Sequence, residues 1–581
     1  MMKNKHLRVF ATATLVEGCT ALLFFLSRRS DQESARLFGF SYLRLGIAGA
    51  DLIVLGFVAL FTFEVFQNKR FVELITQSIA GYLEKPTCEF GKRLFIIQGA
   101  FILAVVALIE VFFHTWLSFP PPLRPMIVWA ILICFQTWLI LRVAYAQDYR
   151  KRLSLAARLR SKWNGSLPVQ RKVFAILAIL GLIYFLAFIP FNLLPDIHGK
   201  AFIYQDERVI YPDVVKALTP QENFGATVYA VLANWTWSYG YPYLPISAGV
   251  LIIPRLIFGN QFAQHMELNI FLMRQFVSVL PMVLALMLAV YLVTRYKSTR
   301  LSVSLFVFLM LVPGIVKINY QFWHPDSIIL LLVLLTIYFL QKDDQRFGHY
   351  FYLAAVACGL TTAIKLWGLF FFLAIAGYLM AGFFRHKLSL KKSLLSGLLF
   401  ILTMLGTIII TSPSLLSPFI ARMALDSWTG QQEKILLGPE RIDPTGYYQT
   451  TLTNWLKYFG QHFMKAYFFF FATFALVAGS LWGSRKALNR ILLAWCLPAT
   501  IFLAYFSAMK SFQYMLPVGI PLYCGAFLFP AIAENPTYPK WLSFLAKPLT
   551  RKIIWWVTLA FFASQFIINL VILVLFAQRG R

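Results

Sequence analysis

The sequence predicts an all-α, polytopic transmembrane bundle of about 15 helices, and three observations support this prediction. Of the 581 residues, 59% are hydrophobic and only 13% are charged, and the mean hydropathy is +0.69. A soluble chain of this length needs a more polar surface than this composition supplies. Apolar runs of about 20 residues recur along the whole chain, and this length matches a hydrocarbon core about 30 Å thick.

The expected helices follow these apolar runs. The first run lacks the small-residue cleavage pattern of a signal peptide, so we expect it to be retained as a helix. The helices are expected near residues 8–27, 45–66, 94–117, 125–146, 173–194, 270–294, 301–318, 326–341, 350–365, 366–383, 393–411, 465–483, 491–508, 513–532 and 553–577.

A basic linker at residues 150–172 divides the chain into a four-helix N-terminal bundle, residues 1–149, and a larger transmembrane module, residues 173–581. The linker contains eight Lys or Arg residues and no acid. Because basic loops remain on the cytoplasmic side, we expect the linker and the N-terminus there. Counting helices from the linker then places two long loops, 195–269 and 412–464, on the outer side.

One segment of the first outer loop, 227–258, is moderately apolar. The helix that follows must run from the outside inward, so this segment crosses the membrane either twice or not at all. We expect amphipathic helices that lie on the outer interface. The localisation predicted by this count is a multi-pass protein of a bacterial plasma membrane.

The net charge of +29 is typical of the positive-inside bias of membrane loops. It is spread over many short loops, which argues against a nucleic-acid partner. The six cysteines show no CxxC spacing, and most lie inside apolar runs, so we expect free packing thiols. Membrane lipids are the expected surroundings of the chain.

The first outer loop carries an acidic pair, Asp206 and Glu207, in QDERVIYPDVVKAL. A carboxylate at this position can act as a general base or hold a metal ion. The alternative is an ordinary solvated acidic pair. Asp206, Glu207 and Asp326 could coordinate a divalent cation if they converge, so the sequence leaves a metal open, and no other cofactor is expected.

The motif NYQFWHPDS places His324 and Asp326 at the outer start of a helix. The alternative is a helix cap beside an interfacial aromatic belt. Two lysines, Lys365 and Lys510, lie at other outer corners, with Tyr514 one helical turn after Lys510. Each lysine can either snorkel to the interface or point into a cavity.

A further candidate, Arg422, lies in the second outer loop, where it could cover a site or pack passively. The helix count from the basic linker did not use these candidate residues, and it places all of them on one side of the membrane. Acids, cations and aromatic residues on one side suit the phosphate head group of a lipid and a polar acceptor.

The order of these motifs resembles the GT-C superfamily of membrane glycosyltransferases, in its protein O-mannosyltransferase and aminoarabinose transferase branch. The resemblance covers about residues 173–532. It rests on QDERVIYPDVVKAL, WSYGYPYLPISAGVLIIPRLIFG, WHPDS, GLTTAIKLWG and MKSFQYMLP, in this order. Two features depart from the branch: Gln513 stands where an arginine is usual, and the four N-terminal helices are an addition.

The resemblance implies an enzyme that moves a sugar from a polyprenyl-phosphate donor to an acceptor hydroxyl at the non-cytoplasmic face, with inversion. Asp206 would be the general base and Glu207 would help to position the acceptor. The donor-phosphate residues would be Lys365, Lys510 and Tyr514. The remaining site candidates are His324, Asp326, Tyr241 and Arg422.

This chemistry needs few groups. A phosphate-linked sugar already has a good leaving group, so one base and a few cations suffice without a general acid. The acceptor stays open between protein, lipid and glycan. Two alternatives remain at this point: a transporter or lipid flippase, and a polymerase or ligase that uses a lipid diphosphate.

Overall fold

The computed structural model describes residues 167–193, 205–223, 239–320, 322–386, 389–412, 451–507, 511–534 and 547–579, with isolated positions elsewhere. The chain forms two compact units. The smaller unit comprises Met1–Gly165, Thr219–Trp235 and Ser412–Ser427. Its described part includes two short antiparallel strands, β1 (Arg36–Leu37) and β2 (Phe40–Ser41). The four expected N-terminal helices lie outside the described residues.

The larger unit is helical over its described residues. In chain order its elements are α7 (Pro168–Ala187), α8 (Ile189–Asn192), α9 (Gln205–Leu218), α11 (Tyr243–Phe258), η4 (Gly259–Gln264), α12 (Met266–Met273), the π-helical η5 (Arg274–Val279), α13 (Leu280–Thr294), α14 (Thr299–Met310), α15 (Pro313–Asn319), α16 (Asp326–Asp343), α17 (His349–Ile364), η6 (Trp367–Phe371), α18 (Phe372–His386), α19 (Leu390–Thr411), α21 (Leu452–His462), α22 (Ala466–Trp482), α23 (Lys486–Ile501), the π-helical η8 (Phe502–Phe506), α24 (Phe512–Phe527), η9 (Phe529–Ile532) and α25 (Pro548–Arg579).

Every helix expected from residue 173 onward has a counterpart in this unit, which confirms the predicted polytopic helical bundle. Among the described residues, seven helices are long and apolar enough to cross a membrane, or nine if two bent pairs each count as one span. Local capping explains several of the boundaries. Ser298 accepts a hydrogen bond from the Leu301 amide at the start of α14, and Thr451 does the same for the Asn454 amide at the start of α21.

The bent pairs lie where the sequence breaks the helical pattern. Pro313 lacks an amide hydrogen and starts α15 after a 63° turn from α14. The second pair is α21 and α22, which meet at 100°. Helix α21 lies in the predicted outer loop 412–464, where no helix was expected.

Helix α11 occupies the segment for which we predicted interfacial helices. With η4 it covers Tyr243–Gln264 and is long and apolar enough to cross a membrane by length and composition. Its arginine, Arg255, binds the Leu218 carbonyl through Nε at 3.1 Å and so attaches α11 to the end of α9. The interfacial placement of this segment stays a prediction.

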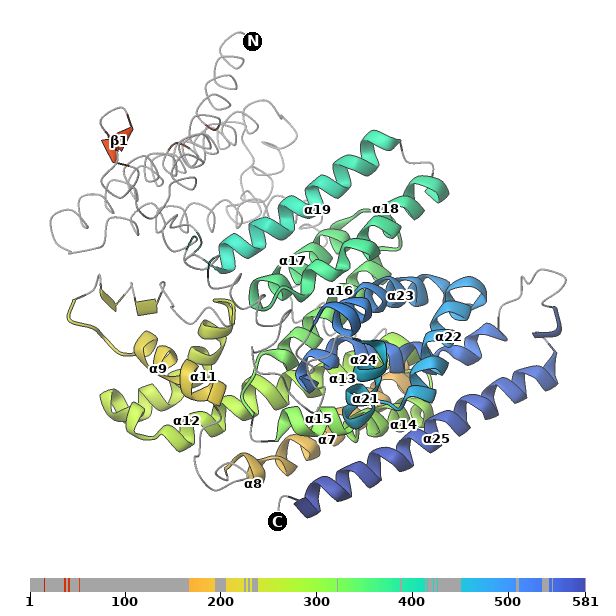
Figure 1. Ribbon diagram of the computed structural model, residues 1–581, viewed down its shortest axis with the longest axis horizontal. Coiled ribbons are helices and arrows are strands. Elements are labelled where there is room, and N and C mark those ends of the chain that lie inside the picture. The colour runs from red at the N-terminus through yellow and green to blue at the C-terminus, as the bar shows by residue number, and fades with distance from the viewer. Residues whose placement is uncertain are drawn as a thin grey trace, which may run out of the picture. The chain divides into compact units, whose positions relative to one another are not determined.

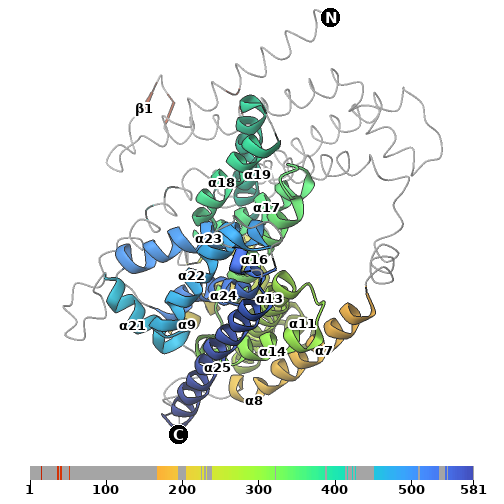
Figure 2. The same ribbon diagram turned by 90° about the vertical axis from the view of Figure 1, so that its right-hand side faces the viewer.

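The core of the larger unit is built on α13, α16 and α24, which lie in its middle in both ribbon views (Figure 1, Figure 2). Large side chains such as Trp323, Trp495 and Tyr523 are fully buried there. Helix α25 runs along the edge, with 11% of its most apolar window buried. Since α16 begins at Asp326 and α17 ends at Ile364, just before Lys365, Asp326 and Lys365 lie at the same end of this core.

Candidate functional site

A buried ion pair joins α9 to the π-helical turn η5. Arg274 donates to Glu207 through Nε at 2.9 Å and through Nη2 at 2.7 Å, and both side chains are fully buried. The Nη1 atom of Arg274 also donates to the Asn192 carbonyl at 3.3 Å. A fork of two parallel bonds fixes both the distance and the orientation of the carboxylate. The carboxylate of Glu207 is therefore held rigidly against η5.

The same carboxylate holds the turn that leads into α16. Oε1 of Glu207 accepts the Trp323 amide at 2.7 Å. The Trp323 ring is fully buried, stacks on Tyr243 at 5.5 Å and donates from Nε1 to Ser247 at 3.2 Å. Because Trp323 is the first residue of the WHPDS turn, this contact places Glu207 beside that turn.

Three ionisable residues form a network at the start of α16. The Asp326 carboxylate is fully buried, pairs with the His324 ring and accepts a hydrogen bond from Lys365 Nζ at 3.0 Å. The Asp326 side chain therefore faces the protein interior at the start of α16 and not the solvent. Lys365 keeps 16% of its side chain exposed, and it turns inward to Asp326 instead of snorkelling outward.

A tyrosine from the first of the two loops predicted to be outer completes this network. The Tyr239 hydroxyl hydrogen-bonds to His324 Nε2 at 2.5 Å, and the Tyr239 ring lies 5.7 Å from Lys365 Nζ. The next residue, Gly240, donates from its amide to the Ile364 carbonyl at 2.8 Å. A Cβ at Gly240 would collide with the Ala363 carbonyl oxygen. Only glycine permits this close approach of two backbones, which brings Tyr239 to the corner that carries Lys365.

Lys365 stands at the head of an apolar cavity of about 320 Å³, which we call the Lys365 cavity. Its polar lining is Lys365, Ser507 and Tyr514, and the Lys365 ammonium lies 4.4 Å from the centre of the Tyr514 ring. The rest of the lining is apolar: Leu366, Trp367, Leu369, Phe370, Phe372, Phe502 and Leu503. A cation at the head of an apolar cavity fits an anionic head group on a hydrocarbon chain.

The structure brings four of the predicted site residues together: Glu207, His324, Asp326 and Lys365, with Tyr514 beside the last. Asp206 lies in the first turn of α9, and its side chain is outside the described part of the chain.

Three other predicted residues have no described place in this network. Lys510 lies outside the described residues. Arg422 belongs to the smaller unit, which is described by itself. Tyr241 is buried, but the tyrosine that reaches His324 is Tyr239, two residues earlier.

Two residues of the network were missed in the sequence. Arg274 is a charged residue inside an otherwise apolar span, and such a residue usually faces the bundle interior and has a partner. That signal could have identified it. Tyr239 is one of three tyrosines in YGYPY, and no sequence signal separates it from Tyr241.

Within the described part of the chain, no three His, Cys, Asp or Glu side chains gather as metal ligands do. Of the three acids for which a cation was left open, Glu207 is bound to Arg274 and Asp326 to Lys365. The described groups supply a paired cation, a buried carboxylate and hydrogen-bond donors, which together can hold a phosphate and orient a hydroxyl.

A comparison with known protein families matches residues 254–416 to the dolichyl-phosphate-mannose-protein mannosyltransferases. The matched stretch contains Arg274, His324, Asp326 and Lys365. Comparisons with curated proteins and with solved structures give no match. The helical bundle and the family match agree with the GT-C resemblance that the order of motifs in the sequence indicates. Through residues 254–416 the chain is similar to the dolichyl-phosphate-mannose-protein mannosyltransferases, a family of GT-C membrane glycosyltransferases.

Proposed function

We propose that this enzyme transfers one sugar from a polyprenyl phosphate to an acceptor hydroxyl at the outer face of the membrane, with Asp206 as the general base. The observation that carries the proposal is the position of Lys365, which is paired with the buried Asp326 and stands at the head of the apolar Lys365 cavity. The isoprenoid chain occupies the apolar part of the cavity and the phosphate lies at the ammonium.

The Lys365 ammonium suits this role because it has three donors. One is used by Asp326 at 3.0 Å. Tyr514 packs its ring against the same ammonium. As the bond between the sugar and the phosphate breaks, negative charge grows on the phosphate, and a cation already in place stabilises it without reorganisation.

The contacts of Glu207 support different roles for the two residues of the acidic pair. Its two carboxylate oxygens accept two bonds from Arg274 and one from the Trp323 amide. Glu207 is therefore a positioning residue that holds the WHPDS turn. Asp206, its neighbour in the first turn of α9, is left to take the proton of the acceptor hydroxyl.

The reaction then proceeds by one displacement. The acceptor oxygen forms a bond to the anomeric carbon while the bond from that carbon to the phosphate oxygen breaks. The hydroxyl proton goes to Asp206, and the electron pair of the broken bond remains on the phosphate. Direct displacement inverts the anomeric centre. Polyprenyl-phosphate mannose is the first donor to test, because the matched family is named for a mannose lipid, and a protein is the first acceptor.

The test follows the loss of radiolabelled mannose from polyprenyl phosphate in membranes that contain the enzyme, which also supply the acceptor. Asp206→Asn should lower the rate by about 10²-fold or more, the usual contribution of a general base. The matched control is Asp213→Asn, two turns further along α9, which should transfer at the wild-type rate. Retained transfer in Asp206→Asn, in protein that is folded, would disprove the assignment of the base.

The alternative of a transporter or lipid flippase is not favoured, because the family match identifies a transferase. A flippase would also move the lipid with its sugar still attached. Label that leaves the lipid and appears on a second molecule therefore separates the two functions.

A further inference from the structure

A second cavity, also of about 320 Å³, lies at the other end of α16. It is bounded by the end of α16 and by faces of α18 and α23, and we call it the Arg490 cavity. Helix α16 has 18 residues, so the two ends of the helix are about 27 Å apart. The Arg490 cavity is therefore remote from the proposed transfer site at Asp326 and Lys365.

The cavity exists because small residues face each other across the seam between α18 and α23. Ala374, Gly377 and Ala381 follow one face of α18, and Ala487 and Ala494 follow one face of α23. A Cβ placed on Gly377 meets no atom within 4 Å. The space at Gly377 is therefore open and not filled by a neighbouring helix.

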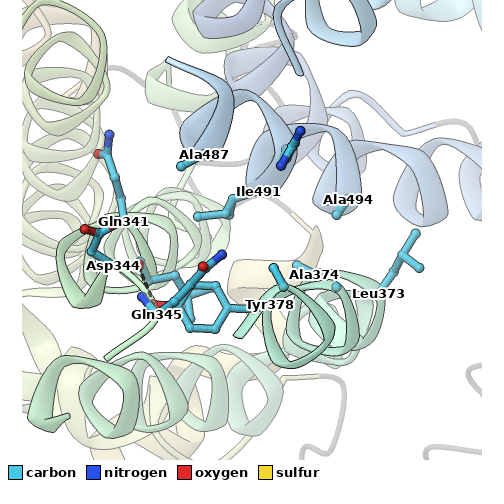
Figure 3. Close-up of a pocket in the computed structure, with 13 residues that line it drawn as sticks. Gln341, Asp344, Gln345, Leu373, Ala374, Tyr378, Ala487, Ile491 and Ala494 are labelled. Carbon is cyan, nitrogen blue, oxygen red and sulfur yellow. Dashed lines mark hydrogen bonds between the residues drawn. The ribbon is translucent and has the colours of Figure 1, made fainter. Parts of the chain in front are cut away.

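The lining changes in polarity from one end to the other. Figure 3 shows Gln341, Asp344 and Gln345 gathered at one end and Leu373, Ala374 and Ala494 at the other. The polar end belongs to the side of the module that carries the basic loops and is predicted to be cytoplasmic. An amphipathic cavity in this position fits a lipid whose head group lies at that interface and whose chain points to the middle of the membrane.

The polar end carries both signs of charge. Arg490 donates from Nε to the Ser480 carbonyl at 3.0 Å, which orients its guanidinium at the rim. Asp344 ends α16 in the left-handed conformation, with φ of 50°, and its side chain is exposed. At the same end of α16, the Gln341 Oε1 atom is buried and lacks a hydrogen-bond donor among the described residues.

We infer that the Arg490 cavity binds a phospholipid whose head group carries both a phosphate and a primary ammonium, as in phosphatidylethanolamine. The phosphate pairs with Arg490. The ammonium lies at Asp344 and supplies the donor that Gln341 lacks. A purely anionic head group would bring its charge close to Asp344, and a head group without an amine hydrogen could not satisfy Gln341.

The floor of the cavity is rigid enough to hold such a ligand. The Tyr378 hydroxyl donates to the buried Asp343 at 2.7 Å and accepts the Gln345 amide. Asp343 also accepts the amides of Phe347 at 2.9 Å and Gly348 at 2.8 Å. These bonds fix the loop after α16, so that Asp344 and Gln345 do not have to be ordered when the lipid binds.

The experiment measures which lipids stay with the full-length protein after purification into nanodiscs that contain equal amounts of phosphatidylethanolamine, phosphatidylglycerol and phosphatidylcholine. Native mass spectrometry counts the retained lipids. The wild type should retain phosphatidylethanolamine about tenfold over the other two. Arg490→Gln should lose this retention. Asp344→Asn should bind phosphatidylglycerol and phosphatidylethanolamine about equally.

Gly377→Leu fills the cavity without touching the rim and should abolish the retention. Its matched control is Gly406→Leu on α19, where a Cβ also meets no atom within 4 Å. Equal retention in Gly377→Leu and Gly406→Leu, with both proteins folded, would overturn the inference. Displacement of phosphatidylethanolamine by added polyprenyl phosphate would also overturn it, because the cavity would then hold the donor chain. No donor is present in the main measurement, so its failure would leave the proposed transferase function untouched.

Discussion

The Lys365 cavity and the Arg490 cavity have the same volume, about 320 Å³; the first is lined mainly by η6 and η8, and the second by α18 and α23. They differ in how their charges are held. Lys365 is fixed by a buried carboxylate and a network that continues to Tyr239. Arg490 and Asp344 are exposed, and Arg490 donates to the Ser480 carbonyl. Volume does not distinguish the proposed reaction site from the proposed lipid site, but the burial of the charges does.

This contrast agrees with the cost of burying charge. A buried ion pair is expensive and gains little stability over an apolar pair, so its presence points to a task such as positioning. The end of the bundle with Lys365 contains two buried pairs, Glu207 with Arg274 and Asp326 with Lys365. Exposed charges at the Arg490 cavity cost little and suit reversible binding of a head group.

The largest effect is expected from breaking a buried pair at the Lys365 end. Arg274→Met leaves Glu207 fully buried without its cation, which should destabilise the protein by about 3–5 kcal/mol. The double variant Glu207→Gln with Arg274→Met should recover a large part of the melting temperature, because no buried charge is left alone and the new amide oxygen can still accept the Trp323 amide. A single and a double variant of equal stability would contradict the buried-pair account.

A smaller effect is expected from the backbone contact that places Tyr239. Gly240→Ala brings a Cβ onto the Ala363 carbonyl oxygen, so the segment must shift, at a cost of about 1–3 kcal/mol. The shift should separate Tyr239 from His324 and lower transfer. The control is Gly249→Ala on α11, where a Cβ meets nothing within 4 Å and should be neutral or slightly stabilising. Equal activities for the two variants would show that this contact is unimportant.

The sequence allowed most of the helices to be predicted, because hydropathy is a local property. The helix expected near 326–341, for example, is α16 (Asp326–Asp343). The WHPDS turn and the lysine corner were also found, since their residues are unusual beside apolar spans. The pairings between them were not found, because Glu207 and Arg274 are 67 residues apart and only the packing of α9 on η5 brings them together.

Two features needed the tertiary structure. The Lys365 side chain points inward because it binds Asp326, which lies 39 residues earlier in the sequence and is buried at the start of α16. The choice of Tyr239 over Tyr241 depends on the amide of Gly240, which bonds to the Ile364 carbonyl. Neither contact leaves a periodic pattern in the sequence, so propensity and hydropathy cannot reveal it.

The most direct test of the account is the affinity for polyprenyl phosphate of purified wild type, Lys365→Met and Arg490→Met. The double variant Lys365→Met with Asp326→Asn is included, so that no buried carboxylate is left alone. The account predicts binding at least about tenfold weaker in both Lys365 variants, the loss of one charge-assisted contact, and wild-type binding in Arg490→Met. Equal losses in the Lys365 and Arg490 variants, or wild-type binding in both, would contradict it.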